Sequence, residues 1–270
     1  MVKINKDTIL CISIASKPSN LGTAIHNQAY KHLGLNFIYK ACAVTDAKAA
    51  IQGVRALGIR GCSVSMPHKE KVIEYLDELD PVAKEIGAVN TIVNTHGKLK
   101  GYNSDAHGFE SVLHDLQISP GSSVLVLGGG GVAKAILYIL KKNKFNSVSI
   151  ANRNRSRAEE LAKSYNFTSI NWGDREKSNF DFLINATSIG MNPNSDRSPI
   201  KLKSVPKYSY IFDVVISPTE TLLISEAKRK NIVCRPGYRM TLYAAKMQFE
   251  LYTGQKTPIE VMEKTILELL

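Results

Sequence analysis

Cysteine is scarce in this chain, and its few cysteines form no recognisable framework. The 270 residues include 4 cysteines, Cys11, Cys42, Cys62 and Cys234, without a C-x-x-C pair. Each lies in or beside an apolar run, so we expect buried thiols in a reducing compartment. The histidines His26, His32, His96, His107 and His114 have no metal-ligand spacing, and no metal is predicted.

Long hydrophobic runs are also missing. No segment approaches the roughly 20 apolar residues that span a bilayer, and Met1 to Ile9 alternates charged and apolar residues. The sequence therefore predicts a cytoplasmic protein with no membrane partner.

Acidic residues are outnumbered, with 24 Asp and Glu against 35 Lys and Arg and a net charge of +11. This charge favours anionic partners, including dinucleotide phosphates and small carboxylic acids. The basic residues are mostly scattered and no nucleic-acid motif accompanies them, so we expect a solvated basic surface and no nucleic-acid partner.

Short apolar runs alternate with amphipathic stretches throughout the chain. Strands are expected at 9–14, 37–43, 61–65, 123–127, 147–150, 182–185 and 210–215. Helices are expected at 23–33, 47–57, 71–76, 132–141, 156–164, 221–230, 240–251 and 258–270. This alternation predicts an α/β fold of parallel sheets with helices on both faces.

Two domains fit the length and the pattern. Pro120 and Gly121 precede a buried strand and read as the entry to a second α/β unit. We expect a substrate-binding catalytic domain at 1–104 and a doubly wound, Rossmann-type dinucleotide-binding domain at 105–237. Residues 238–270 are expected to pack back on the first domain, with a cleft between the two domains.

A glycine-rich turn follows the strand Ser123–Leu127 and opens a helix. Its residues Gly128, Gly129, Gly130, Gly131 and Val132, with Ala133, satisfy G-x-G-x-x-A. Glycine there permits positive φ and lets backbone N–H groups approach a pyrophosphate at the helix N-terminus. We predict a dinucleotide site; a purely structural glycine turn is the alternative.

The next strand is followed by basic residues where an NAD enzyme would carry Asp or Glu. The chain reads Asn152, Arg153, Asn154, Arg155, Ser156 and Arg157. A guanidinium can pair bidentately with a 2′-phosphate, so Asn152, Arg153, Asn154 and Arg157 predict NADP as the cofactor. These arginines disfavour NAD without deciding against it.

Two segments of the first half carry polar residues unsuited to a plain core. Gly61 to Glu70 ends in a Pro-containing turn that presents Lys69, and Gly101 to Asp105 ends at the expected domain boundary. Taken alone, Lys69 reads as a solvated charge, and Asp105 as the N-cap of a helix that begins near His107.

Together these segments resemble the shikimate and quinate dehydrogenase family over nearly the whole chain. Besides the glycine turn, the matching motifs are Ser65 to Glu70, Gly87 to Ile92, Asn103 to Asp105, Asn152 to Ala158, Asn185 to Met191 and Gly237 to Met240. The resemblance implies an NADP-linked alcohol dehydrogenase of aromatic amino acid biosynthesis that acts on a small carboxylate.

The resemblance also implies roles for single residues. Lys69 is the acid/base and Asp105 its partner, while Asn90 and Ser65 contact the substrate, and Val214 and Gly237 line the nicotinamide. A cationic lysine held by a carboxylate suits this chemistry, because it can protonate a developing alkoxide. His68 is interpreted as structural.

The family pattern breaks in the expected substrate pocket. Asn20 and Gly22 stand where the family usually carries two carboxylate-binding serines, Ile216 replaces a tyrosine, and Ala244 replaces a glutamine. These changes resemble the shikimate dehydrogenase-like branch, in which Asn20, Ser19 or Thr23 could rebuild a carboxylate site. A sensor without turnover and an NAD-linked quinate-type enzyme stay open, as do a monomer and a homodimer.

Overall fold

The structure is a computed structural model, and it describes residues 4–177, 179–201 and 208–270 of the chain. The described residues divide into two compact units. The first runs to His107 and takes in Leu242–Leu269, and the second comprises Gly108–Thr241. Within the described residues, no helix is long and apolar enough to cross a membrane.

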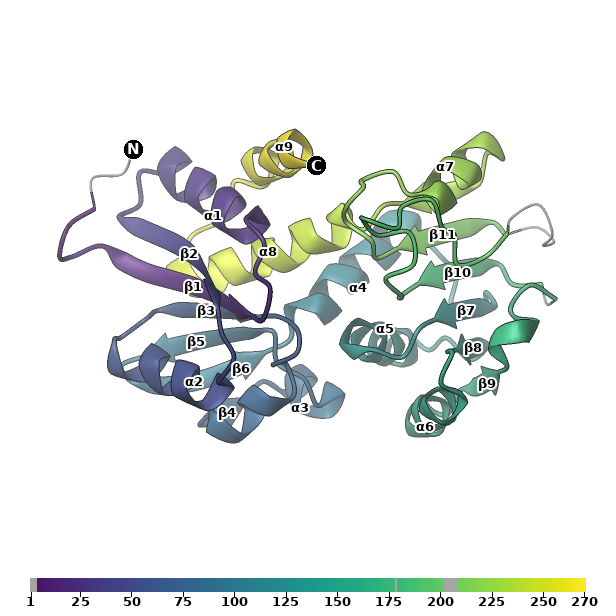
Figure 1. The fold of residues 1–270 in the computed structure, drawn as a ribbon, viewed down its shortest axis with the longest axis horizontal. Helices are drawn as coiled ribbons and strands as arrows, with labels where there is room; N and C mark the ends of the chain where they lie inside the picture. The colour runs from purple at the N-terminus through teal and green to yellow at the C-terminus, as the bar shows by residue number, and fades with distance from the viewer. Residues whose placement is uncertain (1–3, 178, 202–207) are drawn as a thin grey trace. The chain divides into compact units, whose positions relative to one another are not determined.

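A six-stranded sheet forms the centre of the first unit, in the order β2-β1-β3-β5-β6-β4 (Figure 1). Its strands are β1 (Ile9–Ala15), β2 (Phe37–Ala43), β3 (Gly61–Val64), β4 (Glu78–Leu79), β5 (Thr91–Thr95) and β6 (Lys98–Tyr102). β1 is parallel to both of its neighbours, but β5 is antiparallel to β3 and to β6. The prediction of a parallel sheet is therefore wrong for this unit.

A tight hairpin accounts for the antiparallel pairing of β5 with β6. β5 and β6 are joined by His96 and Gly97, whose φ angles are 52° and 86°. Two consecutive residues with positive φ make the two-residue turn whose twist suits antiparallel strands. β6 therefore runs back along β5 without a crossover helix.

Helices flank this sheet. They are α1 (Leu21–His32), α2 (Ala47–Ala56), α3 (Pro81–Ile86), most of α8 (Tyr238–Thr253) and α9 (Ile259–Leu269). The segment expected to be a helix at 71–76 is a 3₁₀ turn at Lys71–Tyr75. α9 packs against α1 (Figure 1). One core cluster includes Ile14, Ile51, Val54 and Ile92.

Side chains of α1 form hydrogen bonds with the backbone of the edge strand β2. Asn27 donates its Nδ2 to the Tyr39 carbonyl and accepts the Tyr39 N–H at its Oδ1, both at 2.8 Å. Thr23 Oγ1 accepts the Ala41 N–H at 3.1 Å. Backbone groups that an edge strand would otherwise present are thereby satisfied.

The second unit holds a parallel sheet in the order β12-β11-β10-β7-β8-β9. Its strands are β7 (Val124–Leu127), β8 (Val148–Ala151), β9 (Thr168–Ile170), β10 (Phe182–Asn185), β11 (Tyr210–Asp213) and β12 (Val233–Arg235). The order reverses between β7 and β10, as in doubly wound folds, which bind ligands at that point. The predicted Rossmann-type architecture is confirmed.

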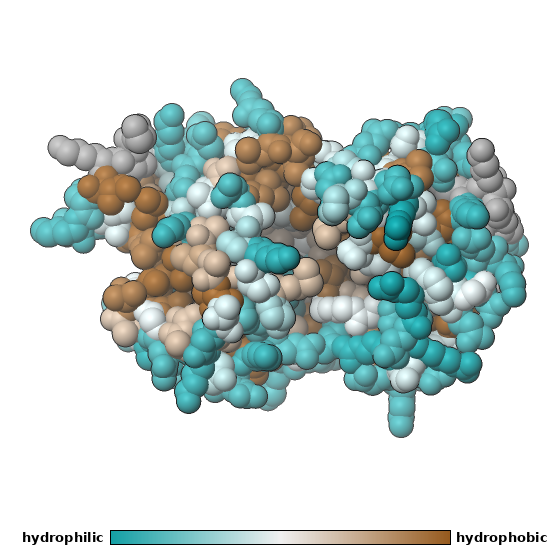
Figure 2. All heavy atoms as spheres, viewed as in Figure 1, coloured by the Kyte–Doolittle hydropathy of each residue, from teal (hydrophilic) through white to brown (hydrophobic). Residues whose placement is uncertain are grey.

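Helices α5 (Gly131–Lys142), α6 (Arg155–Tyr165) and α7 (Leu222–Arg229) follow strands of this sheet, and α4 (Ser104–Leu116) precedes it. Every residue of β7 and β10 is buried, as expected for central strands covered on both faces. On the face drawn in Figure 2, the second unit is largely hydrophilic, whereas apolar atoms gather on the first.

Candidate active site

Lys69 and Asp105 form an ion pair within the first unit. Lys69 Nζ donates to Asp105 Oδ2 at 2.5 Å, and each side chain is only 16% exposed. Lys69 lies in the turn after β3, and Asp105 lies in the first turn of α4. Residues 36 positions apart are thus held in contact and partly shielded from water.

Asp105 is available for this contact because another residue caps its helix. α4 begins at Ser104, and Asn103 Oδ1 accepts the Ala106 N–H at 3.1 Å. Asn103 Nδ2 donates to the Ala88 carbonyl at 3.0 Å. The alternative that Asp105 caps a helix beginning near His107 is therefore wrong.

Asn90 lies close to this pair through Ser104. The Ser104 N–H donates to Asn90 Oδ1 at 2.7 Å, and Asn90 is only 5% exposed. Ser65 is exposed at the end of the same β3 turn, where its N–H donates to the Ile14 carbonyl. The structure thus brings Asn90 beside Asp105, and it places Ser65 and Lys69 on one turn.

The two histidines near these residues are buried against their neighbours. His26 stacks on Tyr39 with ring centroids 4.5 Å apart. Burial lowers the pKa of His26 to about 4, which leaves its imidazole neutral. His68 is 3% exposed and its Nε2 lies 2.9 Å from the Val44 carbonyl, consistent with the structural interpretation.

The glycine turn of the second unit connects β7 to α5. Gly128 has φ +117°, and a Cβ on it would lie 2.7 Å from the Ala186 carbonyl oxygen after β10. Gly130 precedes α5, and a Cβ on it would meet nothing within 4 Å. Gly131 and Val132 open the helix, and the first backbone N–H groups of a helix have no partner within it, as anion binding requires.

The basic segment after β8 folds against this turn. Arg157 Nε donates to the Gly129 carbonyl at 3.1 Å, and its NH1 pairs with Glu160 at 2.7 Å. Asn154 caps α6 by accepting the Arg157 N–H, and Asn152 Nδ2 donates to the Asn154 carbonyl at 3.0 Å. Among the described residues Arg153 has no ion-pair partner, and it is exposed.

Val214 and Gly237 are neighbours in this unit. A Cβ on Gly237 would collide with the carbonyl oxygens of Val214 and Val215. Only glycine lets the chain that enters α8 approach the end of β11 so closely. The two residues expected to line the nicotinamide therefore lie together.

Asp213, at the end of β11, is completely buried and anchors this region. It accepts hydrogen bonds from Asn185 Nδ2, Thr221 Oγ1 and the Val215 N–H, at 2.7 to 3.0 Å. Burial raises the pKa of Asp213 to about 6, against the opposing effect of these donors. No group of His, Cys, Asp or Glu suited to a metal ion occurs among residues 4–177, 179–201 and 208–270.

Comparison with known proteins identifies the family. Residues 19–92 match the shikimate dehydrogenase substrate binding domain, and residues 110–193 match the shikimate / quinate 5-dehydrogenase family. A shikimate dehydrogenase-like protein of Haemophilus influenzae is 41% identical over 96% of each chain. The chain belongs to the shikimate and quinate dehydrogenase family.

Two further members extend this similarity. A protein of Bacillus cereus named shikimate dehydrogenase (NADP(+)) is 36% identical over 93% of this chain and 94% of its own. A crystal structure of a shikimate dehydrogenase in complex with NADP+ has a TM-score of 0.91 at 34% identity, covering 98% of this chain and 97% of that one.

Two of the residues at which the sequence differs from the family pattern, Asn20 and Gly22, lie at the start of the first helix. A Cβ on Gly22 would lie 3.4 Å from the Tyr39 ring, which is ordinary contact, so the fold does not demand glycine there. Asn20 precedes α1 and is exposed, and its side chain makes no capping hydrogen bond.

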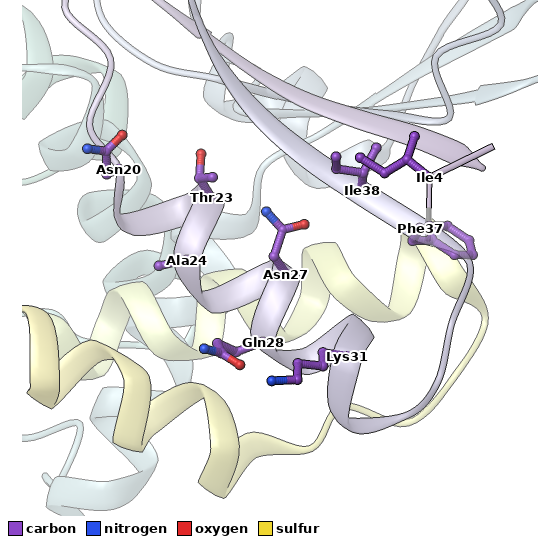
Figure 3. Close-up of a pocket in the computed structure, with 9 residues that line it drawn as sticks. All are labelled: Ile4, Asn20, Thr23, Ala24, Asn27, Gln28, Lys31, Phe37 and Ile38. Carbon is purple, nitrogen blue, oxygen red and sulfur yellow. The ribbon is translucent and has the colours of Figure 1, made fainter. Parts of the chain in front are cut away.

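A cavity of about 500 Å³ runs beside α1 in this unit (Figure 3). It is lined by Ile4, Asn20, Thr23, Ala24, Asn27, Gln28, Lys31, Phe37 and Ile38. Of the residues proposed from the sequence for the carboxylate site, Asn20 and Thr23 border it, and Asn27 is occupied by β2. The cavity therefore does not contain the Lys69–Asp105 pair.

Gln248 is a polar residue of this dehydrogenase that none of the sequence motifs includes. Ala244 replaces the expected glutamine and is buried, but Gln248 follows one helical turn later in α8. Gln248 Nε2 donates to Thr91 Oγ1 at 3.0 Å and to Ser104 Oγ at 3.1 Å. The four-residue spacing from Ala244 was the available signal, since such positions share a helix face.

Proposed function

We propose that the protein is an NADP-dependent oxidoreductase that interconverts a secondary alcohol and a ketone on a shikimate-like cyclic hydroxy acid. The observation that carries this proposal is the Lys69–Asp105 contact of 2.5 Å. It occurs in a chain that keeps the family's glycine turn and basic segment.

The pair supplies the proton chemistry of the reaction. In reduction, a hydride adds to the carbonyl carbon and the oxygen gains a proton; in oxidation both leave. NADPH supplies the hydride when bound. One Nζ hydrogen of Lys69 is held by Asp105, which leaves two to stabilise and protonate the substrate oxygen. Asp105 keeps the ammonium in place.

The residues of the second unit fit NADP. The N-terminus of α5, opened by Gly130 and Gly131, offers N–H donors for the pyrophosphate. No acidic residue follows β8 directly to hold a ribose hydroxyl, and the exposed Arg153 suits a 2′-phosphate. Gly128, Gly129, Val132, Asn152, Asn154, Arg157, Val214 and Gly237 complete the proposed cofactor site.

The first unit is proposed to bind the substrate, with Asn90 and Ser65 as hydrogen-bonding groups. Asn20 and Gly22 mark the position of the altered carboxylate site. If shikimate itself is the substrate, the enzyme serves aromatic amino acid biosynthesis in the cytoplasm.

A steady-state assay with NADP and a panel of cyclic hydroxy acids, including shikimate and quinate, tests the proposal. We expect turnover of at least one member and a loss of about 10²- to 10⁴-fold in kcat for Lys69→Met. Lys71→Met, a change in an exposed lysine two residues away, is the control and keeps wild-type kcat.

The competing candidates give different outcomes. NADP binding without turnover on any panel member would favour a sensor. A higher kcat/KM with NAD and quinate would favour the NAD-linked quinate-type enzyme. Retention of both Lys69 and Asp105 supports the catalytic function, because a sensor needs no acid/base pair.

A further inference from the structure

We propose that Gln248 is a positioning residue that fixes the direction of the Asn90 amide and thereby sets which substrate group the site accepts. The inference rests on the proposed function, in which Asn90 contacts the substrate. It assigns to the altered pocket a feature that replaces the glutamine missing at Ala244.

A hydrogen-bonded chain links Gln248 to Asn90. Gln248 Nε2 donates to the hydroxyls of Thr91 and Ser104. Each hydroxyl then donates its own hydrogen to Asn90 Oδ1, from Thr91 at 2.9 Å and from Ser104 at 3.1 Å. The Ser104 N–H is the third donor to the same oxygen, at 2.7 Å.

The direction of this chain follows from the donor inventory. An amide nitrogen has only hydrogens to offer, so Thr91 and Ser104 must accept from Gln248. Each hydroxyl has one hydrogen: that of Ser104 is left for Asn90 Oδ1, and that of Thr91 is shared between Asn90 Oδ1 at 2.9 Å and Ser104 Oγ at 3.0 Å. Gln248 therefore aligns both hydroxyls toward the oxygen of the Asn90 amide.

The other end of the network holds Gln248 itself in one orientation. Ser63 Oγ donates to Gln248 Oε1 at 3.0 Å. Ser63 Oγ accepts a hydrogen bond from the Tyr39 hydroxyl at 2.7 Å, and it lies 3.2 Å from the Tyr252 hydroxyl oxygen. Because Ser63 accepts from Tyr39, its own hydrogen is available for Gln248 Oε1, and this bond keeps the Gln248 amide from reversing.

The consequence lies on the free side of Asn90. Its oxygen is saturated by three donors, and its Nδ2 makes no hydrogen bond within the described residues. Asn90 can therefore only donate to a ligand. The site selects a substrate that places a hydrogen-bond acceptor, such as a hydroxyl oxygen, beside the carbon that reacts at Lys69.

Gln248→Glu tests this inference, because it keeps the shape but replaces the donor with an acceptor. Thr91 and Ser104 would then donate to the introduced carboxylate and turn their lone pairs toward Asn90 Oδ1. We expect kcat/KM for shikimate to fall by about tenfold, the effect of one misplaced hydrogen bond. Gln248→Met removes the amide without reversing it, so we expect a smaller fall in kcat/KM than for Gln248→Glu. Gln255→Glu, the same change in an exposed glutamine outside this network, should retain wild-type kcat/KM.

A double-mutant cycle with Asn90→Ala separates positioning from a structural role. If Gln248 acts through Asn90, Gln248→Glu adds no further loss in the Asn90→Ala background. If the two losses multiply, the inference is overturned.

The side-chain amide resonances of Asn90 provide a readout that needs no turnover. They are assigned by their absence in Asn90→Ala, and we expect them to shift in Gln248→Glu but not in Gln255→Glu. Unchanged resonances in Gln248→Glu would overturn the inference even in an active enzyme. Shifted resonances in a protein that oxidises no panel member would instead refute the proposed function and leave the positioning intact.

Discussion

Gly128 and Gly130 occupy the same turn but differ in what a side chain would meet. Gly128 combines φ +117° with a near contact to the Ala186 carbonyl, whereas Gly130 has φ −83° and open space around it. A glycine can therefore be required by the fold at one position and by a ligand at the other.

Alanine at these two positions separates the requirements. Gly128→Ala should lower the free energy of unfolding by at least about 2 kcal/mol, through backbone strain and the collision with Ala186. Gly130→Ala should cost about 1 kcal/mol or less but weaken NADP binding, because its methyl group occupies the approach to the pyrophosphate. Urea unfolding and NADP titration of both variants measure the two effects. Unchanged NADP affinity in Gly130→Ala would place the pyrophosphate elsewhere.

Arg153 and Arg155 form a matched pair for cofactor choice. Arg155 is committed to Glu159 at 2.7 Å, while Arg153 has no ion-pair partner among the described residues. Arg153→Ala should reduce the affinity for NADP by about tenfold or more and leave that for NAD nearly unchanged, because only NADP carries the 2′-phosphate.

Arg155→Ala is the control and should change neither affinity by more than about twofold, as expected for an exposed ion pair. Fluorescence titration with both cofactors measures the ratio. An equal loss for NADP and NAD in Arg153→Ala would contradict the assignment.

At the scale of elements, the sequence predicts buried strands well and the hairpin poorly. The strand at Val124–Leu127 is a continuous apolar run between a Pro-Gly turn and a glycine turn, and the structure buries all four residues. β5 instead contains Thr91 and Asn94, whose polar side chains are buried and hydrogen-bonded. Such residues do not resemble a core strand until their partners are known.

The candidate site shows the same division. Lys69 and Asp105 could be identified from their motifs, and the structure places them in contact. Gln248 lies outside these motifs, and its contacts could not be predicted because its partners Ser63, Thr91 and Ser104 are distant in sequence. Local pattern indicates which residues carry charge, but only the tertiary fold decides which amides and hydroxyls meet.

Asp213, at the end of β11, should make the stability of the second unit depend on pH. Burial holds the pKa of Asp213 at about 6, above its ordinary value of 3.8. The folded protein therefore binds this proton more tightly than the unfolded chain does. Its contribution to stability is present at low pH and is lost as the pH rises through 6.

We expect the contribution of Asp213 to fall by about 2 kcal/mol between about pH 4.5 and about pH 7. Asp213→Asn has no proton to bind and should lack this component, whatever its overall stability. Urea unfolding across the pH range, taken as the difference between wild type and variant, measures it. A flat difference would show that the three donors outweigh burial and keep Asp213 ionised.

At the scale of the whole molecule, the chain contains two units with separate hydrophobic clusters. A ligand that binds one folded unit stabilises that unit by mass action. NADP at about 100 times its dissociation constant should add about 2.7 kcal/mol to the second unit. Thermal melts therefore need not follow a two-state transition.

Calorimetry with NADP, NAD and no cofactor checks this expectation. Lys69→Met should retain the full NADP-induced rise in Tm, because Lys69 belongs to the first unit. If the NADP-induced Tm shift disappeared in this variant, the assignment of NADP binding to the second unit alone would be wrong.

The side-chain amide of Asn27 has a consequence for association between copies. By covering the backbone of Tyr39 on both its N–H and its carbonyl, it acts as a one-residue substitute for the strand that would otherwise lie next to β2. A neighbouring chain in an extended conformation finds the hydrogen-bonding positions at Tyr39 and Ala41 already occupied. Neither a partner protein nor a misfolded copy of this chain can therefore add a strand to β2 at Tyr39 and Ala41.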